Sequence, residues 1–368
     1  MLGFEAFVVG GGPAGLAASI ALRLKGYTVA VADCALPPFE KPCGEGLMPD
    51  SQAALRQLGV NLTAAHGFPF RGIRLIEGER SVEGDFPSAT GFGVRRPILQ
   101  KLLIDRAEQL GVRMSWGVKG IRFRAGKLSV EGTPIRADLI VAADGHNSPL
   151  RCAAGLDSAR RSSFRYAYRR HYARAPWSDY MELHWGDGFQ IYVTPVSSQE
   201  ICVALMSHDP KLRLDGALTR LPEIGKRLAG QPVSSKEMGA VTVWRRLRRL
   251  TLEGFALAGD AAGSVDAITG EGLRLAFQGA TELASAIEAG DLRRYEQAHT
   301  RMRRRTDEMA RVLTLLGDVP GLRQRVMAAL VRSPGMFEGL LGMHVGSATL
   351  LDFRPAQVLG FGWQLLAA

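Results

Sequence analysis

The chain has 368 residues, which is enough for one large domain or for two closely joined domains. Hydrophobic residues make up 46% and aromatic residues 7% of the chain, and 46 basic against 36 acidic residues give a net charge of +10. This composition is typical of a soluble globular α/β protein and excludes a disordered, collagen-like or coiled-coil chain.

The first predicted elements form a strand–turn–helix–strand unit. An apolar run at Glu5–Val9 is followed by the glycine turn Gly10–Gly15, a helical pattern at Leu16–Leu24 and a second strand at Thr28–Ala32. This order and length are typical of a βαβ unit that binds a dinucleotide.

The glycine spacing in this turn satisfies the pattern G-x-G-x-x-G. Gly10 allows a tight turn, Gly12 lets the main chain approach a pyrophosphate, and Gly15 lets the helix pack close to the strand. The start of the helix offers unpaired N–H groups and a partial positive charge to the phosphates. Asp33, at the end of the second strand, is expected to accept a hydrogen bond from a ribose hydroxyl.

The chain from residue 42 to residue 143 alternates between strands and helices. Pro97 is well placed for the first turn of a helix that begins at Arg96. The expected elements are a loop of small residues at Pro42–Leu47, a helix ending at Leu58, a hairpin within 70–86, a helix to Leu110, and strands at Val112–Trp116, near Ile121, near Leu128 and at Asp138–Ala143.

The second half of the chain predicts a sheet followed by helices. Alternation and a high aromatic content between Phe164 and His208 predict an antiparallel sheet. The other expected elements are helix at 212–228 interrupted at Pro222, a buried strand at Phe255–Asp260, a long helix at Leu273–Ile287, and helices from Leu292 to Leu341 with breaks near Pro320 and Pro334.

No repeat, linker or clean boundary divides the chain, so the strands of the nucleotide-binding sheet are expected to be interrupted by insertions. We predict three parts on this basis: a discontinuous cofactor-binding domain from 1–70, 94–160 and 245–291, an antiparallel substrate-domain sheet from 71–93 and 161–244, and a C-terminal helical region at 292–368.

Two further turns that join glycine and aspartate follow apolar strands, at Asp144-Gly145 and Gly259-Asp260. Together with Gly10–Gly15, with Arg96, and with the turn Gly270-Glu-Gly272, they make the sequence resemble the flavoprotein monooxygenase superfamily typified by p-hydroxybenzoate hydroxylase. Within it, the sequence is similar to the geranylgeranyl-reductase-like branch. The resemblance implies a Rossmann-type FAD-binding domain with an inserted antiparallel sheet and C-terminal helices.

The resemblance also implies residue roles. The first glycine turn would hold the FAD pyrophosphate and Asp33 the adenosine ribose. Arg96 would approach the FAD, Val118 would lie near the adenine, and Asp260 would bond the ribityl chain or the phosphate region next to it. The candidate cofactor-binding residues are Gly10, Gly12, Pro13, Ala14, Gly15, Asp33, Cys43, Gly44, Arg96, Val118, Asp144, Gly145, Asp260, Gly270, Glu271 and Gly272.

The turn before the last helix of the cofactor domain, Cys43 and the binding of NAD(P)H can also be judged without the resemblance. The N–H groups and helix dipole after Gly270-Glu-Gly272 would stabilise negative charge on a reduced flavin. Cys43 is either a small residue in a tight turn or a thiol close to the flavin, as in prenyl reductases. No second G-x-G-x-x-G unit exists, so NAD(P)H, the expected electron donor, is predicted to visit a groove rather than a domain of its own.

The sequence leaves more than one reaction open for the bound flavin. Gln190–Pro195 stands where prenyl reductases usually carry Tyr-x-Trp-x-Phe-Pro, and no tryptophan fits the Trp-x-Trp-x-Ile-Pro pattern of halogenases. We therefore expect a monooxygenase that hydroxylates an aromatic or polyketide-type small molecule with NAD(P)H and O2 through a flavin C4a-hydroperoxide, and both a lipophilic and a more polar substrate stay open. The alternatives are a reductase of isoprenoid double bonds and a flavoprotein that acts on a protein partner.

Strand parity provides candidate catalytic residues. Tyr180, Glu182 and His184 share one face of a strand, and Gln190, Tyr192 and Thr194 share one face of the next. Tyr192 and His184 are expected to hydrogen-bond a phenol or enol, and His171 and Arg169 are further candidates. For each of them an ordinary structural contact is the alternative.

The remaining signals concern location and partners. Four scattered cysteines, no Cys or His spacing typical of a metal site and no uncharged apolar run of 18 residues favour the cytoplasm and predict no resident metal. The basic stretches at 165–174, 244–249 and 301–305 indicate solvated arginine faces and no nucleic-acid partner. A second interpretation of 301–305 is peripheral contact with an anionic membrane, and methionines 302, 309, 327, 336 and 343 indicate either helix core or a greasy tunnel.

Overall fold

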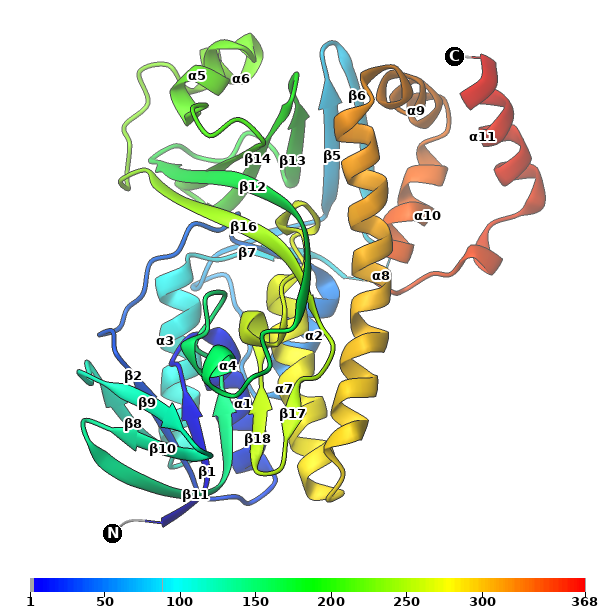
Figure 1. The fold of residues 1–368 in the computed structure, drawn as a ribbon. Coiled ribbons are helices and arrows are strands. Elements are labelled where there is room, and N and C mark those ends of the chain that lie inside the picture. The colour runs from blue at the N-terminus through cyan, green and yellow to red at the C-terminus, as the bar shows by residue number, and fades with distance from the viewer. Residues whose placement is uncertain (1–2, 88, 368) are drawn as a thin grey trace.

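The computed structural model describes residues 3–87 and 89–367. Figure 1 shows a parallel sheet in the lower half of the molecule, an antiparallel sheet above it, and a long C-terminal helix, α8, that runs along one flank past both. The arrangement is the α/β fold that the sequence predicts, with a second, antiparallel sheet and C-terminal helices.

The first sheet is built on the predicted βαβ unit. Its strands follow the order β17-β18-β11-β1-β2-β8, and β18, β11, β1, β2 and β8 are parallel neighbours. Continuous apolar runs make these strands suited to burial on both faces. The strands are β1 (Gly3–Val9), β2 (Val29–Asp33), β8 (Arg113–Trp116), β9 (Ile121–Arg124), β10 (Lys127–Val130), β11 (Thr133–Ala142), β17 (Thr251–Leu252) and β18 (Phe255–Leu257).

Helices pack on this sheet and complete its hydrophobic core. Helix α1 packs against both α3 and α7, and α2 packs against α7. Leu16 and Ile20 of α1 and Phe277 of α7 are fully buried in that core. The helices are α1 (Pro13–Leu24), α2 (Pro49–Gln57), α3 (Arg96–Gln109), α4 (Pro149–Ala153) and α7 (Gly272–Glu288).

The second sheet has seven strands in the order β16-β12-β15-β14-β13-β5-β6. One face packs against the short helices α5 and α6 through residues such as Ile191, Val203 and Leu218. The elements are β5 (Gly72–Glu77), β6 (Arg80–Asp85), β12 (Ala159–Tyr172), β13 (Tyr180–Trp185), β14 (Phe189–Ser197), β15 (Glu200–Ser207), β16 (Met238–Leu247), α5 (Leu214–Thr219) and α6 (Pro222–Leu228).

Two parts of this region differ from the expectation. The sequence does not predict β16, a long edge strand whose residues are mostly half-buried and whose end is rich in arginine. It also does not predict the small sheet of β3 (Gly46–Leu47), β4 (Phe68–Phe70) and β7 (Gly91–Gly93). Strands this short carry too little periodicity to be recognised.

The C-terminal region is helical, and its breaks at Pro320 and Pro334 are confirmed. The elements are η1 (Gly259–Ala262), η2 (Ala267–Thr269), α8 (Leu292–Asp318), α9 (Pro320–Arg332), α10 (Pro334–His344), η3 (Leu350–Asp352) and α11 (Pro355–Ala367). Within the described residues, none of the helices is both long enough and apolar enough to cross a membrane.

Candidate functional site

A cavity of about 1270 Å³ is lined by both sheets and by the C-terminal helices. Small-ligand pockets usually measure up to about 1,000 Å³, so this one has room for more than a single small ligand. Its wall is formed by the turn after β1, the loop at 41–46, strands β12 to β16, the segment from η1 to α7, and helices α8 to α11.

One side of the cavity is bare main chain. Gly12, Gly44, Gly145 and Gly272 come from four separate segments and all line the cavity. A Cβ atom built on any of them would meet no other atom within 4 Å. The four glycines therefore leave an elongated space in which a ligand can approach the backbone, together with Pro13 and Ala14 at the start of α1.

The turn that carries this backbone is tightly packed from behind. Gly10 has a φ of +108°, and a Cβ on it would lie 2.3 Å from the Ala143 carbonyl oxygen. A Cβ on Gly15 would lie 1.8 Å from the carbonyl oxygen of Gly10. Neither position accepts a side chain, and neither residue lines the cavity.

Arg96 supplies a free positive group at the cavity wall. It begins α3 and lines the cavity, and its buried Nη1 has no hydrogen-bond partner among the described residues. Glu45 fixes this end of the helix because its Oε1 accepts from the Arg96 main-chain N–H at 3.1 Å. An unsatisfied buried N–H is costly, so Arg96 fits an anionic ligand.

Two predicted carboxylates are engaged by their own loops. Asp33 accepts from the N–H of Gly11 at 2.6 Å, and Asp144 accepts from the Ser148 hydroxyl and from the Leu150 N–H at 3.0 Å. Asp33, Asp144 and Val118 do not line the cavity. Asp33 and Asp144 therefore hold the turns that border the site, and the neighbours of Asp144, among them Gly145, face it.

The turn before α7 divides into residues that face the cavity and one that does not. Asp260, Gly270 and Gly272 line it, and Asp260 is exposed. Glu271 turns away into a buried cluster, where its carboxylate pairs with Arg274 and lies 3.7 Å from Arg305. The side chain of Glu271 therefore stabilises the fold rather than contacting a ligand in the cavity.

Asp50 belongs to the same cluster. Burial, and then the negative charge of Glu271, raise the pKa of the Asp50 carboxyl to about 6, although Arg274 and Arg305 oppose the shift. The Arg305 guanidinium nonetheless hydrogen-bonds Asp50 at 2.5 Å. Arg305 is therefore fixed beside the cavity by a residue far away in the sequence.

Of Tyr192, His184 and His171, the residues predicted to be catalytic, Tyr192 alone lines the cavity. Its hydroxyl lies 2.8 Å from Gln190 Oε1 and 3.1 Å from the Ile268 carbonyl oxygen. Burial raises the pKa of Tyr192 well above its usual value. A buried tyrosine whose proton is already shared with two acceptors is a poor proton donor or base.

His184 does not reach the cavity, and the expectation that it contacts substrate is wrong. The register of the sheet pairs Leu183, not His184, with Tyr192. Directly paired residues share a face, so Leu183 and Met181 face the cavity while His184 points to the other face. There His184 Nε2 lies 3.0 Å from Glu182 Oε2.

His171 is likewise placed away from the cavity. It is fully buried, with Nε2 2.6 Å from Glu45 Oε2 and Nδ1 2.7 Å from the Ser235 hydroxyl. Arg169, another candidate, does line the cavity, and its buried Nε has no hydrogen-bond partner among the described residues. His171 therefore acts as a structural link, and Arg169 remains a candidate ligand contact.

Glu45, His171 and Cys202 form a buried trio that sequence spacing cannot reveal. Their potential ligand atoms lie within 4.8 Å of one another. However, the guanidinium of Arg169 lies 2.9 Å from His171 Nδ1, and that of Arg95 lies 3.8 Å from Glu45. Two positive groups beside the trio oppose the binding of a metal cation.

Two of the basic stretches are not solvated faces, so that expectation is wrong for them. Arg165 is 6% exposed and pairs with Asp266 at 3.1 Å. Within 301–305, Arg303 is 3% exposed and Arg305 pairs with Asp50. The run at 301–305 therefore forms no continuous basic surface, and membrane contact stays a prediction.

Comparison with known proteins shows which kind of cofactor this cavity is suited to bind. A family described as FAD binding domain matches residues 4–291. This match spans the glycine turn, Arg96 and the segment from η1 to α7. The resemblance that the sequence predicts is thereby confirmed.

Individual relatives differ in the reaction that their names describe. A menaquinone reductase from Mycobacterium tuberculosis is 30% identical over 79% of this chain and 78% of its own. A 2-heptyl-3-hydroxy-4(1H)-quinolone synthase from Mycobacteroides abscessus is 28% identical over 89% and 95%. A geranylgeranyl bacteriochlorophyll reductase-like protein from Thermoplasma acidophilum shares the fold, with a TM-score of 0.72 and 21% identity over 97% of this chain and 95% of that protein.

Proposed function

The chain belongs to the FAD binding domain family and is an FAD-dependent oxidoreductase, and on this premise we propose that it reduces a carbon–carbon double bond in a lipid-like isoprenoid substrate. The reaction would add a hydride to one carbon and a proton to the other, while an electron donor of the NAD(P)H class is oxidised by two electrons. The similarity to a menaquinone reductase supports a reductase, since it comes at higher identity than that to the quinolone synthase.

The apolar end of the cavity is the observation that carries the proposal. Beyond the glycine-lined side, helices α8 to α11 line the wall mostly with aliphatic and aromatic side chains, beside Arg305, Glu308 and His344. The aliphatic and aromatic residues are Val312, Leu313, Leu316, Val326, Leu330, Phe337, Leu340, Leu341 and Phe361. Such a surface favours a long hydrocarbon chain over a compact polar molecule.

The opposite side of the cavity fits FAD. When bound, FAD supplies two-electron transfer. The bare main chain at Gly12 and Gly145 would accommodate its phosphates, with the free Nη1 of Arg96 as a charged partner. The N-terminus of α7 after Gly272 would stabilise negative charge.

The residues that the sequence predicts as bases give hydroxylation no support. Hydroxylation of a phenol profits from a base that removes the phenol proton. Among the residues predicted as bases, His171 and His184 do not line the cavity, and the Tyr192 hydroxyl is engaged by Gln190 and Ile268. His344, whose Nε2 lies 3.7 Å from the Glu271 carboxylate, and His146 do line the cavity. Cys43 and Thr194 line it, and Thr194 Oγ1 has no hydrogen-bond partner among the described residues. A thiol is more acidic than an aliphatic hydroxyl, so Cys43 is the candidate that supplies the proton of the reduction.

Monooxygenation is the second candidate, because the quinolone synthase covers more of this chain. The two are separated by incubating FAD-loaded protein with reductant and either a menaquinone or geranylgeranyl diphosphate, once without oxygen and once in air. We expect an anaerobic product that has gained two hydrogen atoms, detected by mass spectrometry. A product formed only in air that has gained oxygen would overturn the proposal and support monooxygenation.

A further inference from the structure

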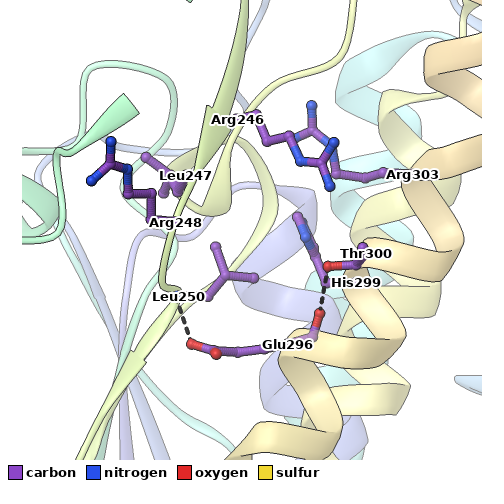
Figure 2. A pocket seen from close by; sticks show the side chains of 8 residues that line it. All are labelled: Arg246, Leu247, Arg248, Leu250, Glu296, His299, Thr300 and Arg303. Carbon is purple, nitrogen blue, oxygen red and sulfur yellow. Dashed lines mark hydrogen bonds between the residues drawn. The ribbon is translucent and has the colours of Figure 1, made fainter. Parts of the chain in front are cut away.

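A small pocket, separate from the large cavity, lies between the end of β16 and helix α8 (Figure 2). Arg246, Arg248 and Leu250 line it from one side, and Glu296, His299 and Arg303 from the other. Its volume is about 40 Å³. Since one water needs roughly 10–15 Å³ of such space, the pocket can hold a few water molecules or one tetrahedral oxyanion.

Arg303 forms the buried base of this pocket and has hydrogen-bonding capacity to spare. It is 3% exposed, and its Nη2 donates to the Ser264 carbonyl oxygen at 3.0 Å. Its Nε and Nη1 are buried without a hydrogen-bond partner among the described residues. Buried guanidinium N–H groups without acceptors are unfavourable, so an acceptor from outside the chain is expected here.

Arg246 provides a second cation at the mouth of the pocket. Its side chain is exposed, and Figure 2 shows the guanidinium groups of Arg246 and Arg303 converging above His299, while Arg248 points away. The mutual repulsion contributes to a lowered pKa of Arg303, after the larger effect of burial. Two like charges held together call for a counter-ion.

Asp307 compensates one of the two charges, but it does so at Arg303 Nη2, so Nε and Nη1 stay without an acceptor among the described residues. The Glu296 carboxylate accepts from the main-chain N–H groups of Leu250 at 2.8 Å and Thr251 at 3.0 Å. Asp307 lies 3.6 Å from Arg303 and also accepts from the Trp244 indole N–H at 2.9 Å. Asp260 acts on Arg303 only through its charge, and it lines the large cavity instead.

We propose that this pocket is a binding site for a phosphate-class oxyanion, held between Arg246 and Arg303. Two guanidinium groups match the oxygen atoms of a tetrahedral oxyanion, and charge-assisted bonds of this kind are strong. Arg303 also connects the pocket to the cofactor region, because it donates to the Ser264 carbonyl oxygen and Ser264 lines the large cavity. Such an oxyanion is either free phosphate or the 2′-phosphate of an NADPH molecule.

Calorimetric titration of inorganic phosphate into the FAD-loaded protein tests the site without any assay of turnover. We expect saturable binding that Arg246→Gln weakens by ~10-fold or more, and Arg246→Lys by less. Arg301→Gln is the matched control, since Arg301 is an exposed arginine of α8 that does not line the pocket, and it should stay within about 2-fold. Flavin content of each variant verifies folding.

Competition identifies the source of the phosphate group. Displacement of phosphate by NADPH but not by NADH assigns the pocket to the 2′-phosphate, whereas phosphate binding that neither dinucleotide affects assigns it to the free ion. Either result supports an oxyanion site. Absence of phosphate binding to the unmodified protein, or equal affinity in Arg246→Gln, would overturn it.

Discussion

The Tyr192 hydroxyl lies 3.1 Å from the main-chain carbonyl oxygen of Ile268 and donates a hydrogen bond to it. Tyr192 belongs to β14 in the antiparallel sheet, and Ile268 to the η2 turn before α7. The bond thus joins the two walls of the cavity close to the proposed flavin position. It gives Tyr192 a structural role that differs from the catalytic role predicted from the sequence.

Replacement of Tyr192 by phenylalanine distinguishes these roles. We expect Tyr192→Phe to lower the free energy of unfolding by about 1 kcal/mol, because a buried hydrogen bond is lost. Flavin content and turnover should stay within about 3-fold of the unmodified protein. Urea unfolding, flavin absorbance and the anaerobic product assay provide the three measurements. A folded, flavin-replete variant without activity would assign the hydroxyl to catalysis instead.

Gly12 is the position at which a side chain would enter the cofactor space without disturbing the fold. Gly12→Val places its methyl groups in the cavity, since a Cβ there meets no protein atom within 4 Å and the φ of −73° suits any residue. We expect soluble protein with little flavin and a melting temperature close to that of the flavin-free protein. Gly120→Val is the control, because Gly120 has equal free space outside the cavity. Full flavin content in Gly12→Val would contradict the assigned position of the cofactor.

Local sequence patterns were sufficient for the parts of the site that a single turn determines. The spacing of Gly10, Gly12 and Gly15 predicts a strand–turn–helix unit, and the packing of Gly15 against the Gly10 carbonyl oxygen gives the physical reason for that spacing. Alternation along one strand also placed Tyr192 and Thr194 on a common face, which lines the cavity.

Relationships between distant segments could not be obtained in this way. Parity within β13 does not reveal which face meets Tyr192, because that depends on its register with β14. The sequence predicts Arg305 to be a surface charge, because its partner Asp50 is distant in the chain and lies beside it only in the folded protein. The same holds for the orientation of Glu271, which depends on Arg274 and His344. Each of these errors involves at least one partner that is remote in the sequence or on another element, as His344 is for Glu271.

Arg96 should affect cofactor affinity more than the stability of the flavin-free protein. Arg96→Met removes the buried Nη1 that has no partner among the described residues, so the free energy of unfolding without FAD should not fall. FAD affinity should fall by about 10- to 100-fold, as measured by fluorescence titration of the flavin-free protein.

Arg23→Met is the contrasting variant for this test. Arg23 donates to the Leu110 and Tyr27 carbonyl oxygens at 2.7 Å each, and it does not line the cavity. Its loss should lower the melting temperature and leave FAD affinity unchanged. Unaltered affinity in Arg96→Met would show that the Arg96 guanidinium does not contact FAD.

His299 should make the fold sensitive to acid. Burial, followed by the charges of Arg303 and Arg246, lowers the pKa of His299 from 6.5 to about 3. Between these two values the unfolded chain binds a proton that the folded chain does not, so stability falls as the pH drops below about 6.5. His299→Gln cannot bind this proton. From about pH 7.5 to about pH 5, the unmodified protein should therefore lose about 1 to 2 kcal/mol more stability than the variant. Urea unfolding in phosphate-free buffer measures both profiles, and parallel curves would show that His299 titrates normally in the folded protein.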